Sequence, residues 1–177
     1  FLGYALYAVP FAYAIAALLS GRLGEEWLRG IRRWNLLAWA FLGLGILFGA
    51  QWAYVELGWG GYWGWDPVEN ASLVPWLTGT ALLHSVMIQE RRGLFKIWNL
   101  LLIIGTFLLC IFATFITRSG FVQSVHAFSP STIGYFFLSF IGVALAGTLG
   151  LILRRRGQLR TQAMLETALS REGTFLL

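Results

Sequence analysis

The chain has 177 residues, of which 58% are hydrophobic and only 12% charged, with a mean hydropathy of +0.69 and a net charge of +5. Soluble domains carry about 25% charged residues, so this composition excludes an ordinary cytosolic globule, a disordered chain and a free nucleic-acid-binding protein. A single cysteine, Cys110, and the lack of any CxxC or CxxCH motif exclude an internal disulfide, a cysteine-type zinc site and a c-type cytochrome. Phe1 already lies in an apolar run without signal-peptide features, so we expect a piece of a longer membrane protein.

Long uncharged stretches divide the chain into membrane spans. A helix needs roughly 20 apolar residues to cross the hydrocarbon core of a bilayer. Five stretches of suitable length predict transmembrane helices at 1–20, 34–55, 72–89, 97–117 and 131–153. Pro130 marks the expected start of the last helix, and a tail follows at 154–177. The predicted fold class is therefore all-α, a polytopic integral membrane helix bundle that forms one membrane domain.

The basic residues predict how this bundle is oriented. In the five-span arrangement, 12 of the 13 lysines and arginines fall on one side, and only Arg118 falls on the other. The positive-inside rule makes the basic side, including the tail at 154–177, cytoplasmic. The net positive charge therefore indicates topology and contact with anionic lipid headgroups, and no nucleic-acid partner is expected.

The first outer loop, at 56–76, is rich in tryptophan and glycine. Trp52 and Trp76, at the edges of the neighbouring spans, fit an interfacial aromatic belt. Glycines let the backbone approach a flat ligand, and indole rings offer it broad apolar contact. A porphyrin-like ligand is therefore expected at the tryptophans that alternate with glycines, which are Trp59, Trp63 and Trp65.

The end of this loop also has a purely structural explanation. Asp66 can be the N-cap of the next helix, Pro67 suits its first position, and Glu69 falls where a capping box requires it. The sequence shows no Ser/His/Asp arrangement, no site for a metal-activated water and no phosphate-binding loop. Conventional hydrolysis and ATP use are therefore not expected.

Two histidines are candidate metal ligands. His126 lies in the second outer loop, and a neutral imidazole is a good axial ligand for haem iron. A histidine in an exposed loop commonly has no special role, however. His84 lies within the third span, where an ionisable side chain is rare and marks a candidate functional site. A hydrogen bond to a neighbouring helix is the other explanation for His84.

Residues 59–77 resemble the tryptophan-rich WWD signature of haem-handling proteins, and the part from Asp66 onwards is similar to its CcmF branch. CcmF is the haem lyase component of bacterial system I cytochrome c maturation. Further matches to this family lie at 79–85, 117–120, 124–128 and 170–173. The resemblance implies that His126 is one of two outer histidines that flank haem. It also implies that His84 is one ligand of a separate membrane-embedded haem b, with the partner histidines outside this chain.

The resemblance further implies a holocytochrome c synthase of the inner membrane, which works within a multi-subunit complex and attaches haem covalently to the CxxCH thiols of apocytochrome c. The haem chaperone CcmE would deliver haem to the outer face, and thiol-handling subunits of the CcmH and CcmI type would prepare the apoprotein. None of the side chains is expected to act as a catalytic acid or base. The residues expected to contact haem are Trp59, Trp63, Trp65, Asp66, Glu69, Asn70 and Arg118, with His84 and His126 on iron.

Three alternatives remain open at this point. A CcsA-type synthase of system II shares the tryptophan-rich loop, but the extension 68–72 argues against it. A haem transporter would need a polar route through the bundle, and a structural scaffold would use the loop only as an interfacial anchor. Arg118 has its own alternatives, because it can bind a haem propionate or extend from a helix end to the lipid headgroups.

Overall fold

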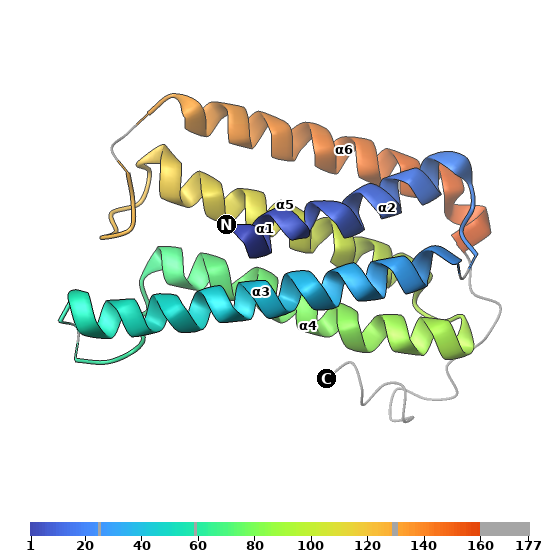
Figure 1. Ribbon diagram of the computed structural model, residues 1–177. Coiled ribbons are helices and arrows are strands. Elements are labelled where there is room, and N and C mark those ends of the chain that lie inside the picture. Colours follow the sequence, from blue (N-terminus) through green and yellow to red (C-terminus); the bar gives the residue numbers. More distant parts are fainter. Residues whose placement is uncertain (25, 59, 129–130, 160–177) are drawn as a thin grey trace.

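The computed structural model describes residues 1–24, 26–58, 60–128 and 131–159, so Trp59 and tail residues 160–177 lie outside the described part (Figure 1). Five helical segments there are long and apolar enough to cross a membrane, counting the consecutive helices α1 and α2 as one span. No strand occurs in the described ranges, which confirms the all-α membrane bundle. The helices are α1 (Leu2–Leu6), α2 (Ala8–Ser20), α3 (Glu26–Glu56), α4 (Pro67–Arg92), α5 (Lys96–Ser119) and α6 (Ile133–Leu159).

The first span is interrupted at Tyr7, between α1 and α2. Pro10 explains the interruption, because a proline has no N–H to donate to the carbonyl four residues earlier and its ring crowds that carbonyl. That carbonyl belongs to Leu6, the last residue of α1. The side chain of Tyr7 itself is only 1% exposed, so the break places a large aromatic residue in the middle of the bundle.

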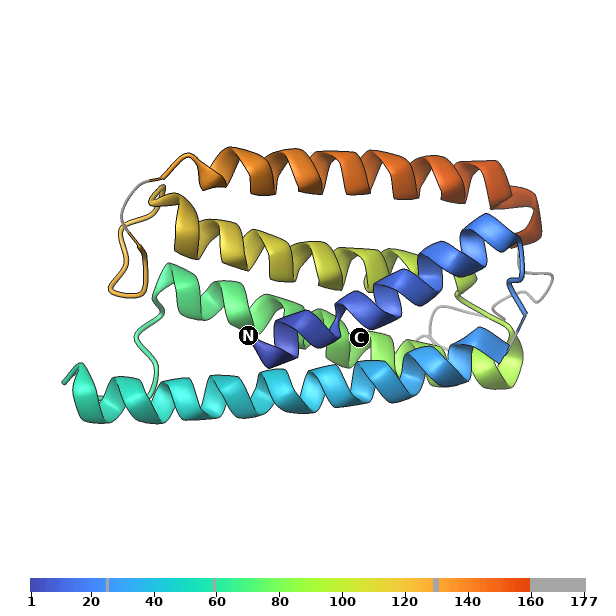
Figure 2. The same cartoon turned by 45° about the horizontal axis from the view of Figure 1, so that its top comes forward.

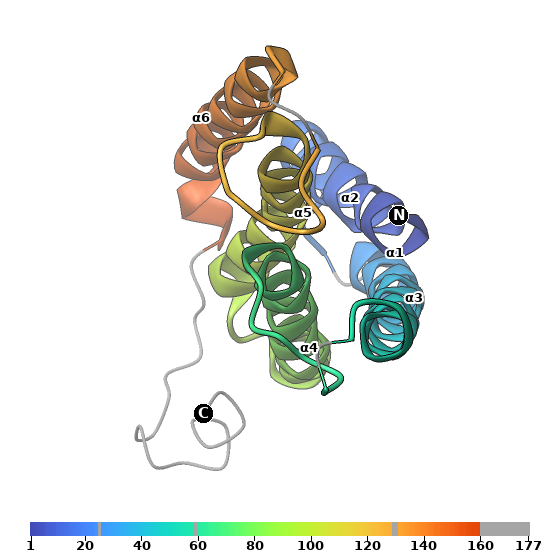
Figure 3. The same cartoon turned by 90° about the vertical axis from the view of Figure 1, so that its left-hand side faces the viewer.

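The five spans run alternately up and down, so the connections between them gather at two ends (Figures 1 and 2). Connections 57–66 and 120–132 share one end, which faces the viewer in Figure 3. We call it the outer end. Arg118 lies there, near the C-terminus of α5. The described basic residues near the opposite helix ends are Arg22, Arg29, Arg32, Arg33, Arg91, Arg92, Lys96, Arg154, Arg155 and Arg156.

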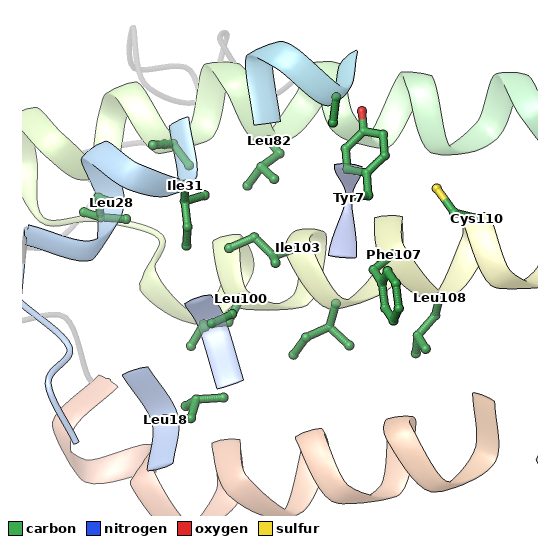
Figure 4. Close-up of a cluster of buried hydrophobic side chains, with 14 of the residues drawn as sticks. Tyr7, Leu18, Leu28, Ile31, Leu82, Leu100, Ile103, Phe107, Leu108 and Cys110 are labelled. Atoms are coloured by element: carbon green, nitrogen blue, oxygen red, sulfur yellow. The ribbon is translucent and has the colours of Figure 1, made fainter. Parts of the chain in front are cut away.

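The core of the bundle forms around α5, the span with the largest buried share, at 50%. Leu100, Ile103 and Phe107 on α5 pack with Leu18 of α2 and Leu82 of α4 (Figure 4). Lipid is as apolar as these side chains, so burial from water alone does not hold the spans together, and close packing and interhelical hydrogen bonds contribute the rest.

Small and polar residues supply both of these contributions. A Cβ on Gly3 would lie 2.6 Å from the backbone of Leu42, so α1 and α3 approach each other as closely as glycine allows. Fully buried Asn99 donates from Nδ2 to the carbonyl of Ser85 at 3.3 Å and to Oε1 of Gln89 at 2.6 Å. These bonds join α5 to α4 inside the membrane.

Arg155 connects the first and last spans at the basic end. Its Nε donates to the carbonyl of Leu18 at 3.1 Å and its Nη2 to the carbonyl of Leu19 at 2.9 Å. The last carbonyls of a helix lack donors within the helix itself. A guanidinium from α6 therefore completes the C-terminal turn of α2.

Candidate functional site at the outer end

The N-terminus of α4 has the predicted capping box. The Oδ2 atom of Asp66 accepts from the N–H of Val68 at 3.0 Å, and Oε2 of Glu69 accepts from the N–H of Asp66 at 3.2 Å. The same Glu69 oxygen accepts from the N–H of Gly64 at 3.0 Å, and Nδ2 of Asn70 donates to the carbonyl of Trp65 at 3.1 Å. Glu69 and Asn70 therefore hold the end of the tryptophan-rich loop against the helix.

The structure brings His126 to this capping residue, although the two are 60 positions apart. Its Nδ1 lies 3.2 Å from Oδ2 of Asp66, and the hydroxyl of Ser124 donates to the same oxygen at 2.7 Å. The Oγ of Ser124 in turn accepts from the backbone N–H of His126 at 3.0 Å. The imidazole is only 25% exposed and the carboxylate 12%. The side chain of His126 is therefore partly buried and fixed by hydrogen bonding, unlike that of a freely exposed loop histidine.

Serine, histidine and aspartate thus do meet in space, which the sequence did not indicate. Their connectivity differs from that of a hydrolase, where the histidine accepts a proton from the serine hydroxyl and the aspartate lies on the far side of the ring. Here the hydroxyl of Ser124 donates to Asp66 itself. The arrangement therefore orients an imidazole and does not activate a serine.

The ring of Trp52 borders this cluster, and the interpretation of Trp76 as an interfacial residue was wrong. Trp52 lies against the ring of His126, with centroids 5.9 Å apart and an angle of 56° between the planes. Trp76 stacks on Trp39 at 5.1 Å with its Nε1 buried, so it is a packing residue within the bundle and does not belong to a belt with a wet indole N–H. The interpretation of Trp76 failed because position at a span edge does not reveal which side of the helix a residue occupies.

The loop tryptophans Trp63 and Trp65 meet edge to face, with centroids 6.3 Å apart. Trp65 has a φ of 55° and a side chain that is 73% exposed. A bulky residue in the left-handed region is uncommon and costs conformational energy. The bond from Asn70 to its carbonyl helps to hold this backbone, which leaves a broad apolar ring on the surface.

Arg118 lies at the same end of the bundle, in the last turn of α5, just before the loop that carries His126. Its Cζ is 4.1 Å from the centroid of the Phe128 ring, a cation–π contact. The backbone N–H of Phe128 donates to the carbonyl of Thr117 at 2.9 Å, and the hydroxyl of Ser131 donates to the carbonyl of Arg118 at 3.1 Å. The guanidinium therefore lies against the ring of Phe128 at the outer end.

His84 is remote from this cluster. It follows Asp66 by 18 positions, roughly 27 Å along a helix at 1.5 Å per residue. Its side chain is exposed on α4, and Nδ1 lies 2.8 Å from the carbonyl of Thr80 in the same helix. Since a carbonyl only accepts, Nδ1 carries the proton. The bond to a neighbouring helix that would have explained His84 structurally does not occur within the described ranges.

Five spans, with a histidine fixed beside Trp52 at one end, define a multi-pass membrane protein with a candidate ligand-binding end. Residues 1–126 match the family model described as cytochrome c assembly protein, and the chain belongs to this family. It is 50% identical over its whole length to the cytochrome c-type biogenesis protein CycK of Bradyrhizobium diazoefficiens, covering 27% of that protein. It is 53% identical over 92% of its length to CcmF of Pseudomonas aeruginosa, covering 25%.

A solved structure named cytochrome c heme lyase CcmF matches 99% of the chain and 26% of that protein, with a TM-score of 0.77 and 40% identity. The resemblance to the CcmF branch is therefore confirmed. The chain spans about a quarter of the length of these relatives.

Sequence reasoning missed two residues of the outer cluster, Trp52 and Ser124. A serine hydroxyl commonly accepts a hydrogen bond from the backbone N–H two residues later, so the contact of Ser124 with the N–H of His126 could have been predicted from the sequence. The contact of Trp52 with His126 depends on how α3 packs beside the second outer loop, so no local pattern predicts it.

Proposed function

We propose that the outer end of this chain holds haem while haem is attached to apocytochrome c in system I cytochrome c maturation. The observation that carries the proposal is the fixed imidazole of His126, whose Nδ1 lies beside the carboxylate of Asp66 and whose ring lies against Trp52. Asp66 directly follows Trp65, whose side chain is exposed. An oriented imidazole beside broad apolar rings is the combination that a planar metalloporphyrin requires.

The residues of the chain would act by binding and orienting. His126 would ligate the haem iron through Nε2, and Trp63 and Trp65 would contact the macrocycle. Arg118 would pair with a propionate, because guanidinium and carboxylate form two parallel charge-assisted hydrogen bonds. Haem supplies the reactive vinyl groups, and each cysteine thiol of the CxxCH motif adds across a vinyl double bond with no leaving group. No side chain of this chain is assigned as an acid or base in this step, and its residues hold the haem in a defined orientation.

Topology and partners follow from the same proposal. The basic end faces the cytoplasm of a bacterium, and the outer end faces the periplasm or cell exterior. The haem chaperone CcmE supplies haem at that face, and subunits of the CcmH and CcmI type present the reduced thiols of apocytochrome c. The structure supports this arrangement by placing Arg118 at one end and every other described basic residue near the opposite end.

Replacing His126 in the complete protein tests the outer site. His126→Ala should lower the yield of holocytochrome c and weaken the spectrum of haem bound to the purified protein, because one iron ligand is lost. Gln123→Ala, an exposed position in the same loop, is the matched control. A structural scaffold predicts normal yields from both variants. A haem transporter predicts that haem added from outside restores the yield of His126→Ala, and that result would contradict a lyase site.

His84 marks the second part of the proposal, a resident haem b within the membrane. With its proton on Nδ1 and the side chain exposed on α4, Nε2 of His84 is available to a ligand held between this chain and the rest of the protein. His84→Ala should lose the b-type spectrum of the complete protein, whereas Met87→Ala, exposed one turn further along α4, should keep it. An unchanged spectrum in His84→Ala would remove this assignment.

A further inference from the structure

We propose that Asp66 and Ser124 are positioning residues for His126: they keep the proton on Nδ1 and so make Nε2 the nitrogen that ligates haem iron. This inference rests on the proposed function, because it concerns how the outer histidine is prepared for its ligand. It assigns Asp66 to the histidine instead of to haem itself, and it gives Ser124 a role.

The carboxylate of Asp66 lies within hydrogen-bond distance of three donor groups. One oxygen, Oδ2, accepts from the backbone N–H of Val68 at 3.0 Å and from the hydroxyl of Ser124 at 2.7 Å, and it lies 3.2 Å from Nδ1 of His126. An ionised carboxylate offers only acceptors, so the imidazole must donate from Nδ1. In a neutral ring the lone pair is then on Nε2, the nitrogen needed for iron.

Ser124 fixes the same histidine from its backbone side. Its Oγ accepts a hydrogen bond from the N–H of His126 while its O–H donates one to Asp66, so the hydroxyl joins the loop backbone to the carboxylate. The two partners of the hydroxyl come from different loops, since Asp66 ends the tryptophan-rich loop and His126 lies in the next outer loop. Asp66 and Ser124 together therefore fix the position of the His126 ring as well as its tautomer.

Partial burial makes this arrangement effective. The side chain of Asp66 is 12% exposed and that of His126 is 25% exposed, so solvent competes weakly for the hydrogen bond. Histidines that bind metals commonly donate their other N–H to a carboxylate, which orients the ring and raises its basicity, and loss of that partner typically costs 10- to 100-fold in metal affinity.

The capping role of Asp66 is the competing explanation, and asparagine separates the two. Asparagine caps helices about as well as aspartate, so Asp66→Asn preserves α4 and the acceptor oxygen but removes the negative charge that faces Nδ1. If Asp66 positions His126, this variant should bind ferric haem about 10- to 100-fold more weakly. The midpoint potential of the bound haem should become more positive, because a less basic imidazole stabilises ferric iron less. If Asp66 only caps α4, neither quantity should change.

The experiment is an absorbance titration of the purified complete protein with ferric haem, together with a redox titration. Ser124→Ala should weaken binding, Ser124→Thr should restore it, and Ser72→Ala is the matched control because its hydroxyl only donates to the carbonyl of Glu69 at 2.7 Å. Asp66→Asn combined with His126→Ala should bind no more weakly than His126→Ala alone, since Asp66 acts through the histidine.

The outcomes separate this inference from the proposed function. If His126→Ala binds haem as the wild type does, the outer site itself is wrong. If His126→Ala weakens binding but Asp66→Asn and Ser124→Ala do not, only the positioning role is wrong. Additive losses in the double variant would likewise overturn the inference, because they would show that Asp66 acts on haem independently of His126.

Discussion

Tyr7 and Gly79 form a close contact between the first span and α4, and they allow a quantitative test of the packing. A Cβ on Gly79 would overlap the hydroxyl of Tyr7 and lie 3.1 Å from its Cζ. Tyr7 is 1% exposed, so it has no room to turn away, and the carbonyl of Gly79 also accepts from Nδ2 of Asn35 at 3.1 Å. Overpacking of this kind costs about 1–3 kcal/mol. Gly79→Ala should therefore lower the ratio of folded to unfolded protein about 5- to 150-fold.

Tyr7→Phe provides the compensating change. The hydroxyl of Tyr7 is buried and has no hydrogen-bond partner among the described residues, so its removal should change the free energy of unfolding little. Tyr7→Phe should recover part of the stability lost in Gly79→Ala, because it removes the atom that the new methyl group overlaps.

The assay is denaturant unfolding of the complete protein in detergent micelles, followed by tryptophan fluorescence. Gly105→Ala is the matched control, because a Cβ at Gly105 meets no atom within 4 Å. If Gly79→Ala proved as stable as Gly105→Ala, or if Tyr7→Phe recovered nothing, the packing described for this contact would be refuted.

Three further predictions concern topology, the outer arginine and the membrane-buried polar cluster. A cysteine at Phe121, which is 83% exposed, should react with a membrane-impermeant thiol reagent in intact spheroplasts, and one at Gly93 should not; labelling at Gly93 alone would reverse the orientation. Arg118→Lys should lower the yield of holocytochrome c several-fold, because lysine lacks the planar fork, whereas a wild-type yield would indicate that the residue only reaches the headgroups. Asn99→Ala should cost about 1–3 kcal/mol in the unfolding assay by leaving Gln89 buried without its donor, and an unchanged midpoint would show that this bond contributes nothing.

Hydropathy predicted the number of spans because lipid requires long apolar helices. It did not predict where each helix begins and ends, because it detects only the apolar part of a helix. Helix α3 begins at Glu26 and continues through Arg29, Arg32 and Arg33 before the apolar stretch starts. These charged turns belong to the same helix as the apolar stretch, because the helical backbone continues past the point where the side chains change from charged to apolar. The interruption at Tyr7 likewise lies inside an apolar run, where hydropathy carries no signal.

In the candidate site, likewise, contacts between residues close in sequence could be predicted, and contacts between distant residues could not. The capping box of Asp66 and Glu69 could be predicted, because all its bonds join residues within a few positions. The contact of Asp66 with His126 could not, since it requires the antiparallel packing of α4 and α5 to bring two loops together. Resemblance to a family named both residues but did not reveal that one holds the other.

The bonds from Arg155 to α2 have a consequence for the order of synthesis. Arg155 follows the carbonyls it satisfies by 137 and 136 positions, so those carbonyls are made long before their donors. At about 5–20 residues per second, the ribosome needs roughly 7 to 27 seconds to cover that distance. During this interval the C-terminal turn of α2 must rely on water, headgroups or the insertion machinery. The two hydrogen bonds that satisfy the C-terminal turn of α2 can therefore form only after α6 has been synthesised as far as Arg155.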